Sequence, residues 1–153
     1  MTQKKSLTSD YLALENQFCF ALYSSSLAMT KTYKPMLEQL GLTYPQYLVM
    51  LVLWQRDDIL VKEIGEALFL DSGTLTPLLK RLEAAELVQR IRDTVDERQV
   101  RILLTSTGKA LRNKAEKIPA QILCASGQNT GTLGQLRDQL RQLRDELNRH
   151  LDD

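Results

Sequence analysis

The segment from residue 60 to residue 104 constrains the fold most, because its hydrophobic spacing changes period within one continuous run. Leu60, Ile64 and Leu68 recur at every fourth position, which predicts one face of a short helix. The polar turn Asp71-Ser72-Gly73 then precedes a second leucine-rich stretch, and two short helices joined by such a turn predict a helix-turn-helix. The predicted inner face of the second helix consists of Leu75, Leu78, Leu79, Leu82 and Leu87.

Beyond this second helix the spacing changes to a period of two. Residues 87–92 and 100–103 alternate apolar and polar side chains on either side of a polar tip at residues 93–98. This pattern predicts a β-hairpin, and a hairpin that directly follows a helix-turn-helix is a wing. We therefore predict a mainly α-helical fold with a small β-hairpin wing, that is, a winged helix-turn-helix.

The polar side chains of the second helix suit contact with DNA. They lie near its N-terminal half, which is the part that meets base edges when such a helix occupies a major groove. A net charge of +1 gives no support by itself, so the prediction rests on their placement. Pro77 requires that the helix begin near Gly73 or be bent at the proline. The candidate contacts are Ser72, Thr74, Thr76, Lys80 and Arg81.

Three helices are predicted before this segment. Residues 9–30 have helical apolar spacing, and a shorter, bent helix that contains Pro35 is predicted to end near Gly41. In the next helix Thr43 and Gln46 suit a capping box, with Pro45 in the first turn. Residues 47–54 are almost wholly apolar, which predicts that this helix is buried in the core.

Two helices are predicted after the hairpin. The first begins at Thr105 or Ser106, is kinked by Pro119 and ends near Gly127. The second carries leucines spaced three and four residues apart, a seam that packs against another helix. The partner of this seam is either another part of the chain or a second copy of it. The seam consists of Leu133, Leu136, Leu140, Leu143 and Leu147.

The composition argues against several classes of protein. One histidine and no Cys-x-x-Cys pair leave a zinc site without ligands, and the chain has neither a Gly-rich phosphate loop nor a Gly-x-Ser-x-Gly elbow. We predict no enzyme activity, no cofactor and no metal site. No apolar run is long enough to span a membrane, and residues 1–5 lead into a polar stretch, so we expect a cytoplasmic protein without a signal peptide.

The chain has two cysteines, Cys19 and Cys124. In the cytoplasm a permanent disulfide is not expected, so the two thiols are either buried or redox-active. Cys19 lies between Phe18 and Phe20, with no Lys, Arg or His within seven residues. It is therefore either a small buried apolar residue or a reactive thiol whose anion depends on hydroxyl donors.

Several motifs together resemble one known family. Asp96-Glu97-Arg98, followed after five residues by Leu104-Thr105, resembles the wing motif of the MarR family of dimeric winged-helix transcription regulators. Residues 75–87 are similar to the recognition helix of that family. Residues 70–79, together with Cys19, Tyr33 and Tyr44, resemble the branch that senses organic hydroperoxides. These matches cover nearly the whole chain.

The resemblance implies a homodimer with interlocked N- and C-terminal helices and two winged heads on double-stranded operator DNA of pseudo-palindromic sequence. In that branch the cysteine that matches Cys19 reacts with the peroxide, and the tyrosines that match Tyr33 and Tyr44 hydrogen-bond to it from the facing subunit. Cys124 matches a second cysteine that forms an intersubunit disulfide, although it can also simply fill a helix end. The wing motif implies DNA contacts by Asp96 and Arg98. Arg98 can also be structural, paired with Asp96 or Asp93.

We therefore expect residues 1–42 to form N-terminal dimerisation and sensor helices, residues 43–104 the DNA-binding domain, and residues 105–153 the C-terminal dimerisation helices. The predicted function is a repressor that binds operator DNA when reduced and leaves it when an organic hydroperoxide oxidises Cys19, followed by a disulfide with Cys124. Two alternatives remain. One is a regulator of the same fold that a phenolic or lipophilic ligand releases without covalent chemistry, and the other is a thiol peroxidase.

Overall fold

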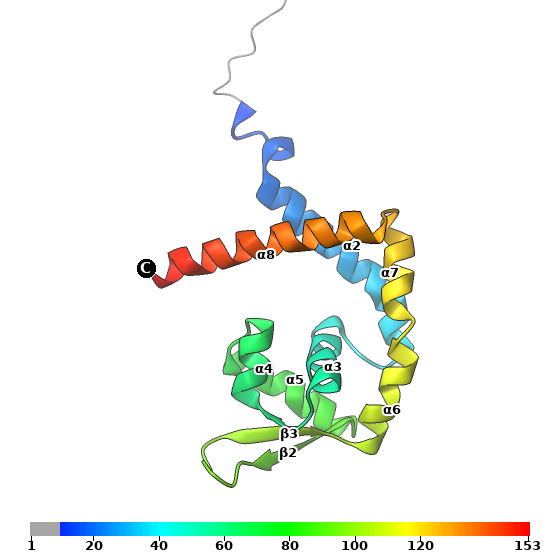
Figure 1. Ribbon diagram of the computed structural model, residues 1–153, viewed down its shortest axis with the longest axis vertical. Helices are drawn as coiled ribbons and strands as arrows, with labels where there is room; N and C mark the ends of the chain where they lie inside the picture. Colours follow the sequence, from blue (N-terminus) through cyan, green and yellow to red (C-terminus); the bar gives the residue numbers. More distant parts are fainter. Residues whose placement is uncertain (1–9) are drawn as a thin grey trace, which may run out of the picture. The chain divides into compact units, whose positions relative to one another are not determined.

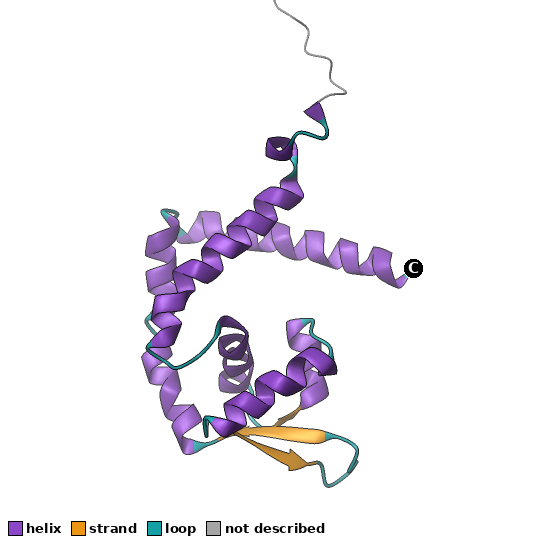
Figure 2. Cartoon of the chain, turned by 180° about the vertical axis from the view of Figure 1, so that it is seen from behind, coloured by secondary structure: helices purple, strands orange, loops and turns teal. Residues whose placement is uncertain are grey.

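The computed structural model describes residues 10–153 and is shown in Figures 1 and 2. The polar N-terminal stretch, on which the expectation of no signal peptide rests, lies outside the described residues. The chain divides into two compact units, one that extends to Ala115 and one that runs from Glu116 to Asp153. Within residues 10–153, no helix combines the length and the apolar character that crossing a membrane requires.

The first long helix begins later than its apolar spacing predicts. Helix α2 spans Phe18–Glu38, and only a three-residue 3₁₀ helix, η1 (Leu14–Asn16), precedes it. The side-chain amide of Gln17 donates to the carbonyls of Tyr11 and Ala13, which holds the chain in a turn before α2. The prediction of a separate, bent helix around Pro35 is wrong, because α2 continues through this proline and buries Leu37 in the core.

Helix α3 (Tyr44–Gln55) confirms the predicted capping box. The Thr43 hydroxyl accepts from the Gln46 N–H at 3.4 Å, and the Gln46 side chain accepts from the Thr43 N–H at 2.9 Å. Burial of α3 is nearly as complete as its composition predicts, since Tyr47, Val49, Met50 and Leu53 are buried. Leu51 is exposed, so one side of the helix lies outside the core.

The helix-turn-helix is present as α4 (Val61–Leu68) and α5 (Ser72–Ala84). Asp71 caps α5 by accepting from the Thr74 N–H at 2.7 Å. Helix α5 begins at Ser72, within one residue of the predicted start at Gly73, and Pro77 lies inside it. Leu87 is buried as predicted, but it follows the end of α5. The buried residues of α5 are Leu75, Leu78, Leu79 and Leu82.

The predicted hairpin is confirmed and forms part of a three-stranded antiparallel sheet. Strands β2 (Val88–Arg92) and β3 (Val100–Leu104) pair from Val88 opposite Leu104 to Arg92 opposite Val100. Strand β1 (Ile59–Leu60) pairs with the other edge of β3, giving the order β1-β3-β2. The sequence did not predict β1, because two residues are too few for a periodic signal. Figure 2 shows the sheet beside helices of the same compact unit.

Three helices follow the hairpin. Helix α6 (Ser106–Ala115) is capped by Thr105, whose hydroxyl accepts from the Gly108 N–H at 3.0 Å. The long helix that Pro119 was predicted to kink is interrupted, since α7 (Ile118–Ser126) begins anew with this proline in its first turn. Helix α8 (Thr130–Asp152) carries the leucine seam, and none of its residues is buried.

Candidate DNA-binding surface and redox site

The exposed face of α5, here called the ridge, consists of Gly73, Pro77 and Lys80. At about 100° per residue, Gly73, Pro77 and Lys80 point away from the buried leucines, and all three are exposed. Gly73 and Pro77 were not predicted as part of this surface, although their lack of long side chains leaves the helix backbone open to close approach. The five predicted contacts divide as follows: Ser72 and Thr76 on one flank, Thr74 and Arg81 on the other, and Lys80 on the ridge.

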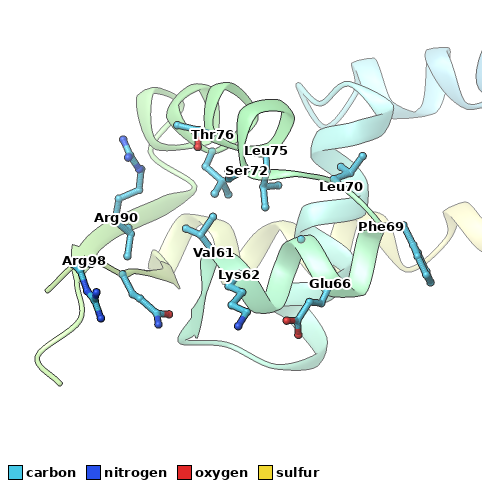
Figure 3. Close-up of a pocket in the computed structure, with 14 residues that line it drawn as sticks. Val61, Lys62, Glu66, Phe69, Leu70, Ser72, Leu75, Thr76, Arg90 and Arg98 are labelled. Carbon is cyan, nitrogen blue, oxygen red and sulfur yellow. The ribbon is translucent and has the colours of Figure 1, made fainter. Parts of the chain in front are cut away.

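A groove of about 660 Å³ lies between α4, α5 and the hairpin (Figure 3). Ser72 and Thr76 line it together with the apolar side chains of Leu75 and Leu79. Arg90 on β2 also lines the groove, and sequence reasoning did not single it out. Its backbone N–H donates to Glu83 at 3.0 Å, which joins the hairpin to α5. The alternating strand pattern was the available signal, because it places Arg90 on the same face as Val88.

Asp96 and Arg98 form an ion pair at the tip of the wing. Arg98 donates from Nε to Oδ1 of Asp96 at 3.0 Å and from Nη2 to Oδ2 at 3.2 Å. These bonds, together with one from the Arg98 N–H, hold the pKa of the Asp96 carboxyl below its usual range. The Arg98 side chain is nevertheless 91% exposed. Of its two predicted partners only Asp96 pairs with it, because Asp93 pairs with Arg101.

Cys19 is exposed and lies in the first turn of α2. The alternative of a buried apolar residue is therefore wrong within one chain, and the neighbouring Phe18 and Phe20 are also exposed. Gln17 precedes the helix without capping it by a side-chain hydrogen bond. The N–H groups of a first helical turn have no partners within the helix, and this end favours negative charge. The sequence did not predict that Cys19 lies in a first helical turn, because its apolar spacing placed the start of the helix near residue 9.

Tyr33 and Tyr44 contact each other, with ring centroids 5.0 Å apart, and Tyr47 lies 5.8 Å from Tyr33. Burial, reinforced by the phenols of Tyr44 and Tyr47, raises the pKa of Tyr33 to about 12. Burial also raises the pKa of Tyr44. Both phenols therefore remain protonated hydrogen-bond donors at neutral pH.

One chain does not bring these phenols to Cys19. Tyr33 follows Cys19 by 14 residues on the same helix, which separates the two by about 21 Å along the helix axis. Tyr44 packs against Tyr33 at that distant end. Within residues 10–153 no hydrogen bond joins either phenol to Cys19, so the predicted thiol–tyrosine cluster is not assembled inside a single copy.

Cys124 lies in α7, in the second compact unit, and its side chain is exposed. The alternative of a buried thiol is therefore wrong within one chain here too. Helix α7 ends two residues later at Ser126, and Gly127 follows with a positive φ of 65°. The Gly127 N–H donates to the Cys124 carbonyl at 3.2 Å, so the thiol lies in the final turn beside a loop.

Comparison with known proteins yields transcription regulators. Residues 31–115 match the family model of the transcriptional regulator SarA/Rot. An organic hydroperoxide resistance transcriptional regulator of Bacillus subtilis (strain 168) is 53% identical over 131 residues, which are 86% of this chain and 89% of the relative.

Two solved structures of AbfR, a protein of Staphylococcus epidermidis, have a similar fold. Reduced AbfR bound to DNA matches with a TM-score of 0.74 and 34% identity, covering 92% of this chain and 99% of that chain. Disulfide-formed AbfR matches with a TM-score of 0.60 and 36% identity, covering 90% and 96%.

The winged helix-turn-helix and these matches define the class as a DNA-binding transcription regulator. The chain belongs to the MarR family of winged-helix regulators, and within it to the branch of organic hydroperoxide resistance regulators. Its relatives are regulators of transcription and not enzymes, which rules against a thiol peroxidase.

Proposed function

We propose that this regulator is a homodimeric repressor that binds its operator while Cys19 is reduced and leaves it when an organic hydroperoxide oxidises Cys19. The observation that carries the proposal is the exposed thiol at the uncapped start of α2, separated from the paired phenols of Tyr33 and Tyr44. In the dimer the partner copy supplies these phenols as hydrogen-bond donors to the thiolate. The site is thus completed only by association.

The exposed apolar faces of the terminal helices support the dimer. Contiguous exposed apolar side chains on a protein surface mark sites of association, and a symmetric pair of chains would cover the same patch twice. These side chains lie between Phe18 and Met29 of α2 and along α8. They are Phe18, Phe20, Leu22, Leu27 and Met29 on α2, and Leu136, Leu140, Leu147 and Leu151 on α8.

We assign operator binding to residues 43–104, here called the winged head. In this assignment α5 enters the major groove, and its two flanks and ridge provide the contacts Ser72, Thr74, Thr76, Lys80 and Arg81. Asp96 orients Arg98, which contacts DNA beside the groove. A dimer then reads two half-sites about 10 bp apart. The DNA-bound structure of AbfR, which is 34% identical to this chain, supports this arrangement.

The proposed reaction has two steps. The Cys19 thiolate attacks one oxygen of the hydroperoxide, the O–O bond breaks, the released alkoxide takes a proton and leaves as an alcohol, and the sulfur is oxidised to a sulfenic acid. The Cys124 thiol of the partner copy then attacks this sulfur, an S–S bond forms and water leaves. The exposed Phe18 and Phe20 beside the thiol favour hydroperoxides with apolar groups.

The disulfide converts this chemistry into DNA release. It joins two helices that also carry the winged heads, so its formation biases a dimer interface with two arrangements and changes the spacing of the heads. The existence of a disulfide-formed structure of AbfR supports this step. In this proposal residues 1–42 and 105–153 form the dimerisation and sensor helices, and the protein acts in the cytoplasm.

Operator binding of the wild type, Cys19→Ser and Cys124→Ser tests the proposal. Each is measured before and after cumene hydroperoxide, on an operator selected from random DNA, with non-reducing gels alongside. We expect the oxidised wild type to leave DNA and Cys19→Ser to remain bound. The matched variant Cys124→Ser should lose the dimer-sized band on the gel.

Two results would change the proposal. Release of Cys19→Ser by the peroxide would refute the sensor role of this thiol and favour a regulator that a phenolic or lipophilic ligand releases. Release of Cys124→Ser without a disulfide band would show that oxidation of Cys19 alone switches the dimer, with the disulfide as a later step.

A further inference from the structure

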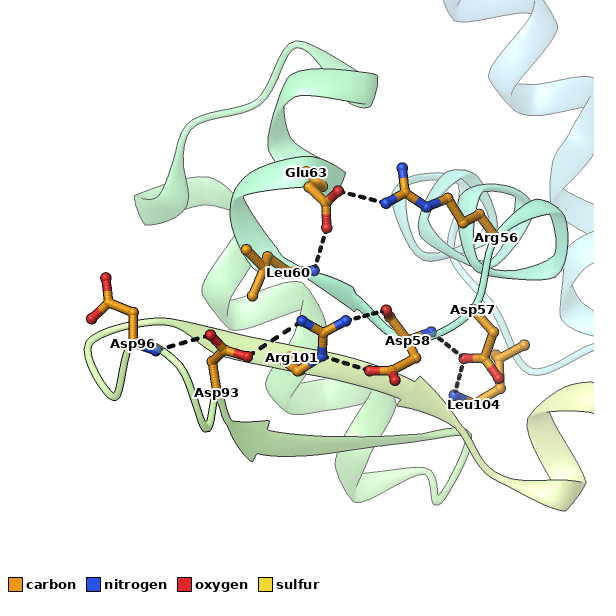
Figure 4. A network of polar contacts seen from close by, with 9 residues as sticks. All are labelled: Arg56, Asp57, Asp58, Leu60, Glu63, Asp93, Asp96, Arg101 and Leu104. Atoms are coloured by element: carbon orange, nitrogen blue, oxygen red, sulfur yellow. Dashed lines mark hydrogen bonds and ion pairs between the residues drawn. The ribbon is translucent and has the colours of Figure 1, made fainter.

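A chain of polar contacts connects the base of the wing to its tip (Figure 4). Arg101 on β3 lies at its centre. It donates from Nε to Oδ1 of Asp58 at 2.7 Å, from Nη2 to the Asp58 carbonyl at 2.6 Å, and from Nη1 to Oδ1 of Asp93 at 3.3 Å. One guanidinium group therefore joins the turn before β1 to the loop after β2.

The Asp58 end of this chain is firmly held. The carboxylate of Asp57 accepts from the N–H of Asp58 and from the N–H of Leu104, each at 2.8 Å. Asp58 itself has a φ of 54°, a left-handed conformation that is uncommon outside glycine. The turn is thus fastened to both ends of β3, through Leu104 at one end and Arg101 at the other.

The Asp93 end leads to the tip of the wing. Asp93 is only 9% exposed, so its carboxylate depends on its partners. Its second oxygen accepts from the Asp96 N–H at 3.0 Å, and its own N–H donates to the Gln99 carbonyl at 2.9 Å. The side chain of Asp96 in turn holds Arg98. The contacts therefore run from Arg101 through Asp93 and Asp96 to Arg98.

We propose that Arg101 is a positioning residue for operator recognition, because its clamp on Asp58 and Asp93 fixes the wing tip that presents Arg98 to DNA. This inference rests on the proposed role of Arg98 as a DNA contact. Removing Arg101 leaves the buried Asp93 carboxylate without its cation, which is costly. The loop then rearranges to hydrate Asp93, and Arg98 moves with Asp96.

Geometry and charge can be separated at this position. Arginine presents a planar fork of N–H donors, whereas lysine presents a single ammonium group on a flexible stem. Arg101→Lys therefore keeps the positive charge but cannot bridge both aspartates in the same way. If Arg101 acts by position, the lysine variant should behave like Arg101→Met. If it acts only as a cation near phosphate, the lysine variant should bind as the wild type does.

The test measures operator affinity of the reduced full-length protein for Arg101→Met and Arg101→Lys, each in the wild-type and in the Arg98→Ala background. We expect either change to weaken binding about tenfold in the wild type, as for loss of one base contact, and to add nothing once Arg98 is absent. A merely structural or electrostatic role would produce losses that multiply. Arg92→Met on β2 is the control, since it removes the same charge outside the clamp and should act equally in both backgrounds.

Arg101→Lys with wild-type affinity, or losses that multiply with Arg98→Ala, would overturn the inference. Thermal unfolding of each variant identifies any that does not fold, and Arg101→Lys carries the test if Arg101→Met is such a variant. Failure of the reduced wild type to bind any selected operator would overturn the proposed function itself. Wild-type affinity of Arg98→Ala would overturn both the wing contact and the clamp.

Discussion

The winged head and the two long helices α2 and α8 bury their apolar side chains to opposite extents. In the head, Val49, Met50, Ile64, Leu75 and Ile102 are completely buried. In α8 no residue is buried, and Leu37 is the one buried residue of α2. Amphipathic helices gain their stability mainly by burying an apolar face. The apolar core of the head is therefore buried within one chain, whereas most apolar side chains of α2 and α8 are left exposed.

This difference separates recognition from sensing. The candidate DNA contacts lie on the self-contained head, while Cys19 lies on an exposed helical face that a single chain leaves uncovered. Chemistry at Cys19 can then alter an interface without unfolding the head. We therefore expect changes on the exposed faces of α2 and α8 to affect association. Changes in the head and in the residues packed against it should affect the free energy of unfolding of each chain.

The largest expected effect is on association. Leu140→Asp places a charge in the exposed leucine seam of α8, and in a symmetric dimer the change occurs twice. Burial of one leucine contributes about 1.5–3 kcal/mol, so association should weaken by roughly 3–6 kcal/mol. Sedimentation equilibrium should show monomers, and operator affinity should fall with them.

The matched control is Gln142→Asp, which adds the same charge on the side of α8 away from the seam. It should leave both the dimer and operator binding intact. A stable dimer of Leu140→Asp would show that the seam is not the surface on which two copies meet.

A smaller effect, on the folding of each chain, is expected from Gly108→Ala in α6, where this helix packs against the head. A side-chain carbon at Gly108 would overlap the carbonyl oxygen of Leu87, and the Gly108 carbonyl already accepts from Trp54 Nε1 at 2.9 Å. Both carbonyl groups belong to the backbone and cannot shift easily to make room for the added carbon. The free energy of unfolding should therefore fall by about 3 kcal/mol. Chemical denaturation measures this change.

Gly134→Ala in α8 provides the comparison for this substitution. The added carbon would approach only the end of the Arg137 side chain, at 3.9 Å, and alanine favours a helix over glycine by up to about 1 kcal/mol. We expect no loss of stability. Equal losses in both variants would contradict the view that α8 lacks the tight packing found where α6 meets the head.

The smallest effect is expected at high pH, through Tyr33. Burial raises the pKa of this phenol from 10.0 to about 12, so the unfolded chain releases the proton first. The stability that the half-buried neutral phenol contributes is complete below pH 10 and is lost as the pH rises to about 12. Tyr33→Phe cannot ionise and should flatten the fall in melting temperature across this window.

Tyr23→Phe, which removes an exposed phenol from the same helix, should keep the wild-type pH profile. An unchanged profile for Tyr33→Phe would show that the phenol of Tyr33 is not shielded from water. It would also weaken the evidence that this end of α2 packs against Tyr44 of α3.

Local signals in the sequence predicted the fold of the head well. Thr43 and Gln46 predicted a capping box and the alternating residues of the hairpin predicted a wing, and both are present. Each depends on neighbours within a few residues, which a sequence displays directly. Strand β1 was not predicted, because it forms by pairing Ile59 with Ile102, a contact between distant parts of the chain.

The candidate sites divide in the same way. Residue type and spacing alone singled out the polar face of α5 and marked Cys19 as either a buried or a reactive thiol. The family resemblance added the peroxide reaction of Cys19 and the two tyrosines. The tertiary structure decided that Cys19 is exposed, that its tyrosines lie beyond its reach in one chain, and that Arg101 joins Asp58 to Asp93. Burial and long-range ion pairs depend on which distant residues meet. The order of residues along this chain determined its elements and their chemistry, and only packing in space determined which of those groups face one another.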